Sequence, residues 1–525
     1  MCDTLLRRTF SVGAALGLLL VPGCHVGEHA SPYAEVIGVP LDEVPGLTVR
    51  EHAVETEHSV VGYRYPLLGA GHPLSAEVRT AMAARQTAFL EELSGSGRPE
   101  LRQDVSVVAA SPEVIGVRLT AVSTAGMRET REASTLWFDA GAERVLPWTA
   151  LFRDEAAVER AHVLLADVLQ EHYHLPLADL PGVIGEAAVR AREEAEATDA
   201  GAEGGSASTD TAGAAGAGAG AEAAEEAARS GLLDVERARE VAQEWEGSPL
   251  EDLAFSTGGG LAVRMDPTQV PGAGGVAEVI LPVEPEDAEE VLSELGFRAR
   301  DAALTGPDPD VPLGDGSSDE RDTLDCQRLK CVALTFDDGP GEHTDDLLDT
   351  LDEYDAKATF YVLGSLVGEF PEALERMAAE GHELGNHTWD HDDLSGKSAE
   401  AVESDMARTN RAVRDVIGSD PPSMRPPYGA LNGTVRKSVG LPIILWDVDT
   451  MDWRSRDTDE VAAYAIEHST SGSVVLFHDI HESSVRAIPD VLTELHRQGF
   501  HFVSVTELFD GTLEPGDVYT DARHE

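Results

Sequence analysis

The sequence predicts a multidomain protein in which an α+β region precedes a unit of alternating strands and helices. Three observations lead to this prediction. The chain has 525 residues, which is too long for one ordinary domain. Strand-like and helix-like patterns are mixed irregularly through residues 48–300, whereas they alternate regularly through residues 326–510. Residues 301–325, rich in Pro, Gly and Asp, separate the two regions and predict a linker.

The first 24 residues have the pattern of an export signal. Arg7 and Arg8 provide a charged beginning, and an apolar run, Phe10–Val21, follows. That run is shorter than the ~20 residues that a membrane-spanning helix needs, and its length is typical of a signal sequence. It ends in VPGC, which resembles a bacterial lipoprotein signal with Cys24 as the lipidated residue. Ordinary cleavage, which would release a secreted protein, is the alternative.

Residues 25–47 are expected to form a tether, and residues 48–300 an α+β domain. DVSVVAASPEVIGVRLTAVST and TLWFDAGAERVLPW alternate apolar and polar residues, as strands joined by turns do. DEAAVERAHVLLADVLQEHY has helical spacing and an acidic start. Residues 193–230 are mostly Ala, Gly, Glu and Ser, which have little to bury, and they predict a flexible excursion.

Apolar strand-like runs alternate with helical segments through residues 326–510. The runs include VALTF, ATFYVLG, PIILWDV, SVVLFHD and FHFVSV, and the helical segments include PEALERMAAEG and AIPDVLTELHRQG. This alternation predicts a parallel sheet or barrel. In a barrel, functional groups gather at the C-terminal ends of the strands. Residues 511–525 are expected to form a tail.

The charge of the chain limits its expected partners. A formal charge of −57 argues against nucleic acid, whose phosphates require a basic surface. It also argues against electrostatic docking to anionic lipid. Membrane contact is therefore expected only through the lipid anchor. The sequence does not indicate an oligomeric state.

The four cysteines fit an exported protein. Cys2 would be removed with the signal and Cys24 would carry lipid, which leaves Cys326 and Cys331. Outside the cell these two are expected to form a disulfide that closes the loop CQRLKC. Two unpaired thiols are the alternative.

Five polar clusters occur in the last third of the chain, each where a strand-like run ends: TFDDGP, NHTWDH, RPPYG, DVDTMDW and LFHD. Taken singly they are weak, since His387 and His391 could be two polar residues on one helical turn. Together they supply two imidazoles and a carboxylate, the ligands of a catalytic zinc site with a position left for water. The other member of the pair Asp337 and Asp338 could take a proton from that water.

These five motifs, in this order, resemble those of the polysaccharide deacetylases of the NodB-homology type, carbohydrate esterase family 4. The resemblance covers the last third of the chain and implies a deformed (β/α) barrel with one divalent metal ion, zinc or a similar ion. The implied activity is hydrolysis of N-acetyl groups on cell-wall glycan. Peptidoglycan is the expected substrate for a protein exported and lipid-anchored to the outer face of the cell membrane. Alternatives are deacetylation of chitin- or xylan-type oligosaccharides, cleavage of an O-acetyl ester, and a glycan- or lysozyme-binding sensor with an inactive barrel.

The resemblance also assigns roles to residues of the metal and base side of the site. Asp337 would be the catalytic base, and Asp338, His387 and His391 the metal ligands. Arg425 would hold and orient Asp337.

On the acid side of the site, the resemblance implies that His478 protonates the leaving amine. Asp449 would fix the orientation and protonation of His478, with Asp452 as the alternative that spacing does not exclude. The backbone N–H of Tyr428 would stabilise the oxyanion. Two residues would line the pocket for the acetyl methyl group and the sugar: Trp453 and Leu476.

The earlier α+β region resembles a second domain type. TLWFDAGAERVLPWTALF and LAFSTGGGLAVRMDPTQVPGAGGVAEVILPV are similar to a domain found outside the membrane in some bacterial deacetylases and in a lysozyme-sensing anti-sigma factor. No catalytic set is visible there, which favours a binding or positioning role. The excursion would then lie inside this domain.

Overall fold

The computed structural model describes the following residues: 34–69, 71–93, 98–126, 128–203, 235–271, 273, 278–314 and 324–523. The predicted signal, with Cys24, therefore lies outside the described residues, as does most of the predicted excursion. Across the described ranges, no helix is both long enough and apolar enough to cross a membrane.

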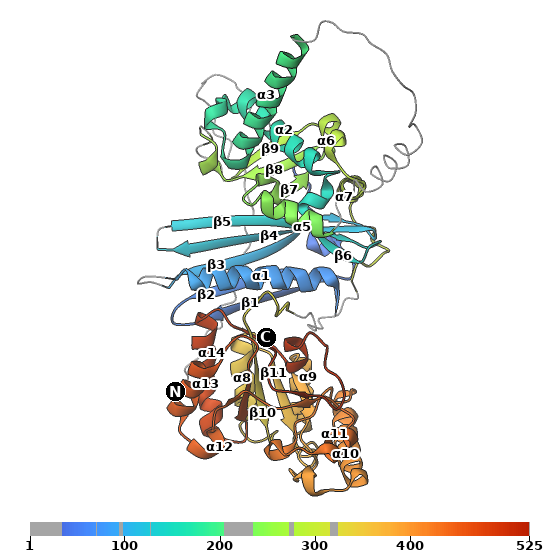
Figure 1. Ribbon diagram of the computed structural model, residues 1–525, viewed down its shortest axis with the longest axis vertical. Coiled ribbons are helices and arrows are strands. Elements are labelled where there is room, and N and C mark those ends of the chain that lie inside the picture. The colour runs from blue at the N-terminus through green and yellow to red at the C-terminus, as the bar shows by residue number, and fades with distance from the viewer. Residues whose placement is uncertain are drawn as a thin grey trace, which may run out of the picture.

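The N-terminal part is built on a six-stranded sheet in the order β1-β2-β3-β4-β5-β6 (Figure 1). Its neighbouring strands are antiparallel except β2 and β3, because helix α1 crosses over between these two and returns the chain to the same end. The bounds are β1 (Thr48–Glu55), β2 (Val60–Leu67), α1 (Pro73–Glu91), β3 (Glu100–Ala110), β4 (Val114–Ala125), β5 (Arg128–Asp139) and β6 (Arg144–Pro147).

The two faces of this sheet are covered by different layers. Successive residues of a strand point to opposite faces. Trp137 accordingly packs among the helices that follow the sheet, whereas Phe138 belongs to the core beneath α1. The first layer contains α2 (Glu155–Tyr173), α3 (Gly182–Glu203), α5 (Val235–Glu244), α6 (Pro285–Val291), α7 (Glu294–Thr305) and the three-stranded sheet β7 (Leu253–Phe255), β8 (Leu261–Met265) and β9 (Val279–Val283).

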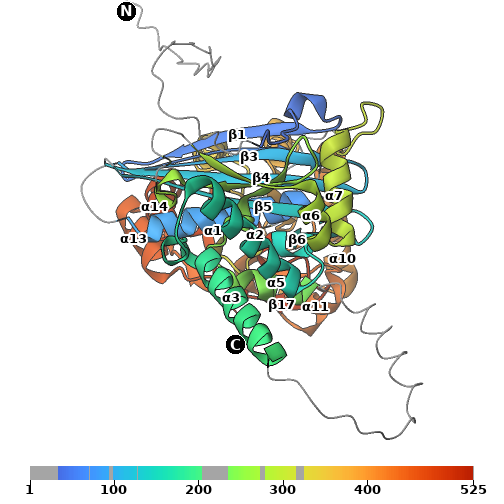
Figure 2. The same cartoon turned by 90° about the horizontal axis from the view of Figure 1, so that it is seen from above.

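Helix α3 lies where the sequence predicted the start of the flexible excursion. It runs to Glu203, so residues 193–203 are helical. Figure 2 shows β1, β3, β4 and β5 side by side in one layer, with α3 extending away from the helices around it. Of the predicted excursion, residues 193–230, the structure describes only residues 193–203.

The C-terminal part is a barrel of parallel strands surrounded by helices. Hydrogen-bonded strands run in the order β12-β11-β10-β15-β14, and β16 pairs with the start of β10. Met424 continues the ring through single bridges to Asn386 and to Ile443, and β13 pairs with β17. Because the ring closes through isolated bridges and two-residue strands, the barrel is deformed, as the sequence predicted.

The strands of the barrel are short and their connecting helices are amphipathic. β10 is buried along its whole length, as expected for a strand covered on both faces. The strands are β10 (Cys331–Asp337), β11 (Ala358–Val362), β12 (Glu383–Asn386), β13 (Ile443–Ile444), β14 (Val448–Asp449), β15 (Val474–His478), β16 (His501–Phe502) and β17 (Val518–Tyr519). The helices are α8 (Thr344–Glu353), α9 (Pro371–Ala379), α10 (Ala399–Ile417), α11 (Gly433–Ser438), α12 (Asp452–Ser455), α13 (Thr458–His468), α14 (Glu482–Arg497) and α15 (Val505–Leu508).

The N-terminal part sits on the N-terminal ends of the barrel strands (Figure 1). Helix α1 makes the contacts: Thr87 Oγ1 lies 2.9 Å from Nε2 of His501 in β16, and Glu77 pairs with Arg328 at 3.0 Å. The Cys326–Cys331 disulfide, with a Cα–Cα distance of 5.5 Å, lies at this same end, where β10 begins. The C-terminal ends of the strands therefore face away from the N-terminal part.

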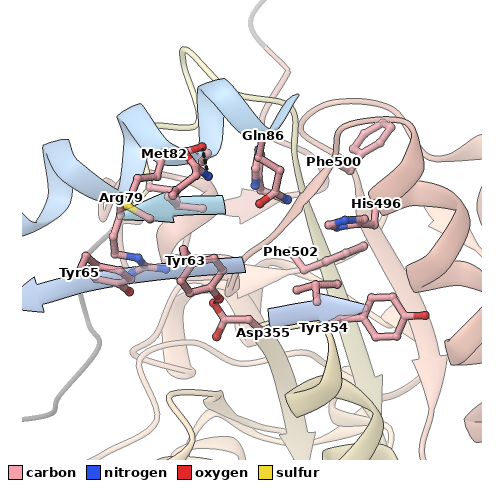
Figure 3. Close-up of a pocket in the computed structure, with 15 residues that line it drawn as sticks. Tyr63, Tyr65, Arg79, Met82, Gln86, Tyr354, Asp355, His496, Phe500 and Phe502 are labelled. Atoms are coloured by element: carbon pink, nitrogen blue, oxygen red, sulfur yellow. Dashed lines mark hydrogen bonds between the residues drawn. The ribbon is translucent and has the colours of Figure 1, made fainter. Parts of the chain in front are cut away.

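A partly buried ionic cluster joins the two parts. The carboxylate of Asp355, in the turn after α8, accepts hydrogen bonds from Arg50 of β1 and from the hydroxyl of Tyr63 of β2. Figure 3 shows Asp355 directed at Tyr63, beside a cavity that lies between α1 and the Phe502 and His496 side chains of the barrel. Burial raises the pKa of Asp355, but the charges of Lys357 and Arg50 outweigh it and lower the pKa to about 2.

We predict that Asp355→Ala lowers the free energy of unfolding by about 3 kcal/mol, because it leaves the Arg50 charge and the Tyr63 hydroxyl without their shared partner. Since the folded-state pKa lies below the ordinary value, this contribution is present above about pH 4 and is lost as the pH falls toward 2. Urea unfolding at pH 7 and at pH 3 measures both effects.

The matched control is Asp104→Ala, which removes the exposed pair of Asp104 and Arg64. An exposed pair contributes under about 1 kcal/mol. Equal losses of unfolding free energy in Asp355→Ala and Asp104→Ala would contradict an energetic role for the partly buried Asp355 cluster.

Candidate active site

The catalytic candidates lie at the C-terminal ends of neighbouring strands. Asp337 is the last residue of β10 and His478 the last of β15, and the two are paired directly in the parallel register. Asp337 also pairs with Tyr361 of β11. The TFDDGP and LFHD motifs are therefore brought side by side by strand pairing, although they are far apart in the sequence.

Asp337 is held by a fully buried arginine. Nη1 of Arg425 donates to Oδ1 of Asp337 at 2.8 Å and to Oγ1 of Thr335 at 2.7 Å. Other nitrogens of the same guanidinium donate to the carbonyl oxygens of Ile444 and Leu445. A buried arginine with its donors engaged in this way fixes the carboxylate and keeps it next to a positive charge. The geometry is the one that the sequence assigned to Arg425.

Asp338 and two histidines form a cluster of possible metal ligands. Oδ1 of Asp338 lies 3.4 Å from Nε2 of His387 and 3.2 Å from Nε2 of His391. The three ligand atoms all lie within 4.8 Å of one another. Oδ1 is buried and has no hydrogen-bond partner among the described residues. Burial raises the pKa of Asp338, but the neighbouring imidazoles lower it to about 2, so the carboxylate is ionised.

The second nitrogens of the two imidazoles are taken by other groups. Nδ1 of His387 lies 2.7 Å from the carbonyl oxygen of Arg425. A carbonyl only accepts, so Nδ1 carries the proton and the lone pair of Nε2 faces Asp338. Nδ1 of His391 lies 3.2 Å from the hydroxyl of Tyr428. This arrangement is typical of metal-ligating histidines, and the three residues fit a divalent metal ion.

The loop that carries the histidines is irregular and has unusual backbone angles. His387 and His391 follow β12 in a loop, which excludes the alternative of two polar residues on a helical turn. Thr388 and His391 have φ of 71° and 59°, and non-glycine residues adopt such values where the surroundings force them. Here Asp405 of α10 accepts from the backbone N–H of Trp389 at 2.9 Å.

The partner of His478 is Asp452. Nδ1 of His478 lies 2.8 Å from Oδ1 of Asp452, and the backbone N–H of His478 donates to Oδ2 at 2.8 Å. The sequence assigned this role first to Asp449, and that assignment is corrected. Asp449 instead accepts from the backbone N–H of Met451 at 3.0 Å. The chain turns at Met451, whose φ is 56°, and the turn brings Asp452 at the start of α12 to the end of β15.

The Asp452 carboxylate keeps His478 protonated. Burial lowers the pKa of His478, but the hydrogen bond and charge of Asp452 outweigh it and raise the pKa to about 9. Asp452 is itself fully buried, and its pKa is lowered although burial opposes the shift. His478 is therefore a cation near neutral pH and a possible proton donor.

The remaining predicted residues surround this centre in different ways. Tyr428 has φ of 61° and a side chain that is 72% exposed, with its ring against His391 at 4.6 Å between centroids. Trp453, next to Asp452 on α12, is 48% exposed. Leu476 of β15 is buried. The exposed residues Tyr428 and Trp453 can therefore contact a ligand in solution, whereas Leu476 is part of the buried strand β15.

Comparisons with known proteins bear on this geometry. A family model described as polysaccharide deacetylase matches residues 325–441. A peptidoglycan-N-acetylglucosamine deacetylase of Bacillus cereus is 38% identical over 192 residues, which cover 34% of this chain and 70% of the relative. The chain belongs to the polysaccharide deacetylase family.

Two further relatives extend the comparison of this polysaccharide deacetylase. A peptidoglycan-N-acetylglucosamine deacetylase of Listeria monocytogenes is 38% identical over 254 residues, 47% of this chain and 52% of the relative. A peptidoglycan-N-acetylmuramic acid deacetylase of Bacillus subtilis is 38% identical over 180 residues, 34% of this chain and 38% of the relative. The chain thus spans about half the length, or less, of these two relatives.

The structure adds two residues to the candidate active site that sequence reasoning did not single out. Thr335 accepts a hydrogen bond from Arg425, and Ser484 donates to Oδ2 of Asp452 at 2.6 Å. Each supports a charged group without facing a ligand. Thr335 is the first residue of the TFDDGP motif, and that place is its one signal in the sequence. Ser484 carries no such signal, because a lone serine in a helix is common.

We predict that Asp452→Asn lowers the pKa of His478 from its value of about 9, because the neutral amide no longer stabilises the imidazolium. NMR titration of histidine-labelled protein measures the shift. Asp449→Asn is the matched control, since Asp449 lies three residues earlier and its carboxylate accepts from Met451. A larger shift in the Asp449 variant would restore the first assignment.

Proposed function

We propose that this chain is a zinc-dependent hydrolase that removes N-acetyl groups from the amino sugars of peptidoglycan. One observation carries the proposal: a fixed carboxylate, a three-donor cluster and an imidazolium meet at one end of the barrel. Hydrolysis of an acetamide needs a base for water, a site for the developing oxyanion and a proton for the amine.

Three residues would hold the metal ion: Asp338, His387 and His391. Two imidazoles and one carboxylate are a usual donor set for catalytic zinc, which favours zinc over harder cations. When bound, the ion would lower the pKa of a water molecule and polarise the acetyl carbonyl.

Asp337 is proposed as the base. Its Oδ1 is held by Arg425, which leaves Oδ2 to accept the proton of the attacking water. The guanidinium of Arg425 also places a positive charge next to this carboxylate. The hydroxide equivalent adds to the carbonyl carbon, and the proton remains on Asp337.

His478 is proposed as the acid. Because Nδ1 is bound to Asp452, Nε2 is the nitrogen that faces the substrate. Its proton passes to the amine nitrogen as the carbon–nitrogen bond breaks, so that acetate and a free amino sugar leave. The backbone N–H of Tyr428 is proposed to stabilise the oxyanion. Two side chains are proposed to form the acetyl and sugar pocket: Trp453 and Leu476.

The assignment of peptidoglycan rests on relatives and on the N-terminal sequence. The names of the relatives include both N-acetylglucosamine and N-acetylmuramic acid deacetylases of peptidoglycan, and the proposal covers both sugars. The signal-like residues 1–24 support export and a lipid anchor at Cys24, which would place the enzyme beside the cell wall. The α+β region, residues 48–300, is proposed as a binding or positioning domain ahead of the catalytic domain, residues 326–510.

We predict that the enzyme releases acetate from purified peptidoglycan and that a chelator stops the release. Asp337→Asn should lower kcat by about 10²-fold or more, since the base is lost, and should still bind zinc. His387→Ala should lose both zinc and activity, because one of three ligands is gone. Acetate assays and metal analysis of each protein measure these outcomes.

The control is Asp415→Asn, on the exposed side of α10. Chitin and acetylated xylan oligomers, tested beside peptidoglycan, rank the substrates. No acetate from any glycan by the zinc-loaded enzyme, or full activity in Asp337→Asn, would contradict the proposed function.

A further inference from the structure

We propose that Asp479 is a positioning residue, whose buried carboxylate holds the loop that begins at Asp338, directly after Asp337, against the strand carrying His478. This inference deepens the proposed function and rests on it for the catalytic roles of these three residues. The loop is residues 338–343, between β10 and α8, and is called the base loop below.

Asp479 ties the base loop to the end of β15 through Thr344. It directly follows His478, is fully buried, and accepts a hydrogen bond from Oγ1 of Thr344 at the start of α8. Oγ1 of Thr344 in turn accepts from the backbone N–H of Gly341 at 2.8 Å. A chain of hydrogen bonds therefore runs from the end of β15, beside His478, to Gly341 in the middle of the base loop.

The same carboxylate lies so close to Gly339 that any other residue there would force Asp479 to shift. A Cβ atom at Gly339 would come within 3.0 Å of both carboxylate oxygens of Asp479, a separation that real Cβ atoms do not show. Gly339 is the second residue after Asp337. On its other side, the carbonyl of Gly339 accepts from the backbone N–H of Leu363, which follows β11, at 3.0 Å. The base loop is thus held between both neighbours of β10.

The constraint matters because Asp338 has a strained backbone. Its φ is 73°, a value that a non-glycine residue keeps only where its surroundings impose it. Gly339, the residue after Asp338, is held by Leu363 through its carbonyl oxygen and is packed against Asp479 at its Cα. Release of one side would let Asp338 relax and turn its carboxylate away from His387 and His391.

A purely structural role would not require a carboxylate at this position. Oδ1 of Asp479 is buried and finds no hydrogen-bond partner in the described part of the chain. Burial also raises the pKa of Asp479 to about 7. An underpartnered buried carboxylate is unfavourable for stability, and an apolar side chain would fill the space with less loss. Its presence beside the base loop therefore indicates a role in the site.

The test measures metal binding and kinetics in the same set of variants. We expect Asp479→Ala to weaken zinc affinity about 10- to 100-fold, the usual effect of removing a group that orients a ligand. It should lower kcat with little change in KM, since substrate contacts remain. Asp479→Asn, which can still accept from Thr344, should recover part of both losses. Thr344→Val removes the hydrogen bond to Asp479 without removing the carboxylate. It should also weaken zinc affinity and lower kcat.

A suppressor pair tests the contact with Gly339. Gly339→Ala alone should weaken zinc binding, because the new methyl group pushes Asp479 away. In the Asp479→Ala background the methyl group has room, so Gly339→Ala should cause a smaller further loss than it does alone. Additive losses in affinity would contradict the proposed contact.

The matched control is Asp447→Asn. Asp447 accepts from the backbone N–H of Val474 at 2.7 Å, at the opposite end of β15. Its replacement should change thermal stability but not zinc affinity or kcat.

Wild-type affinity and kcat in both Asp479→Ala and Thr344→Val would overturn the inference. Should the wild-type enzyme release no acetate from any glycan, the proposed function fails, while the zinc affinities still decide whether Asp479 positions the base loop.

Discussion

The pairing of β10 with β15 is the constraint on which the site depends. In a parallel sheet the carboxyl ends of neighbouring strands meet at one edge, and the register places Asp337 opposite His478. The proposed base and acid are therefore separated by the spacing of two strands, a distance set by backbone hydrogen bonds. Asp337 and His478 can then be rigid, because each is the last residue of a strand and not part of a long loop.

Each charged group of the site has a partner that fixes its direction. Arg425 holds Asp337, Asp452 holds His478, and Asp338 faces two imidazoles. In a buried setting such pairs act more strongly than in water, and unpaired charges would be unfavourable. The site thus has an ionised carboxylate and a protonated imidazole close together at the same pH. Because the carboxylate and the imidazole have oppositely charged neighbours, one site can supply both a base and an acid.

The N-terminal part occupies the other end of the barrel. Its contacts, through α1, His501 and the Asp355 cluster, lie where the strands begin. It contributes none of the described residues of the site. Its position instead directs the C-terminal ends of the strands away from the sheet, so that a large polymeric substrate could approach them without obstruction by this domain.

Much of the catalytic centre could be predicted from the sequence because its residues occur as short local motifs. Asp337 and Asp338 are adjacent, and His387 and His391 are four residues apart, so one strand end or one loop brings each pair together. The alternation of strands and helices likewise predicted a parallel sheet or barrel, since periodicity reports which faces are buried, and the family resemblance implied the deformed barrel.

Only the tertiary structure decided the contacts that depend on chain reversals and on strand neighbours. Asp449 and Asp452 are equivalent by spacing, and the left-handed turn at Met451 selects Asp452. The place of Asp479 depends on three strands lying side by side, because Gly339 after β10 lies against Asp479 and is itself held by Leu363 after β11. Local patterns carry no information on such contacts, since hydrogen bonds between distant segments form only once the chain has folded.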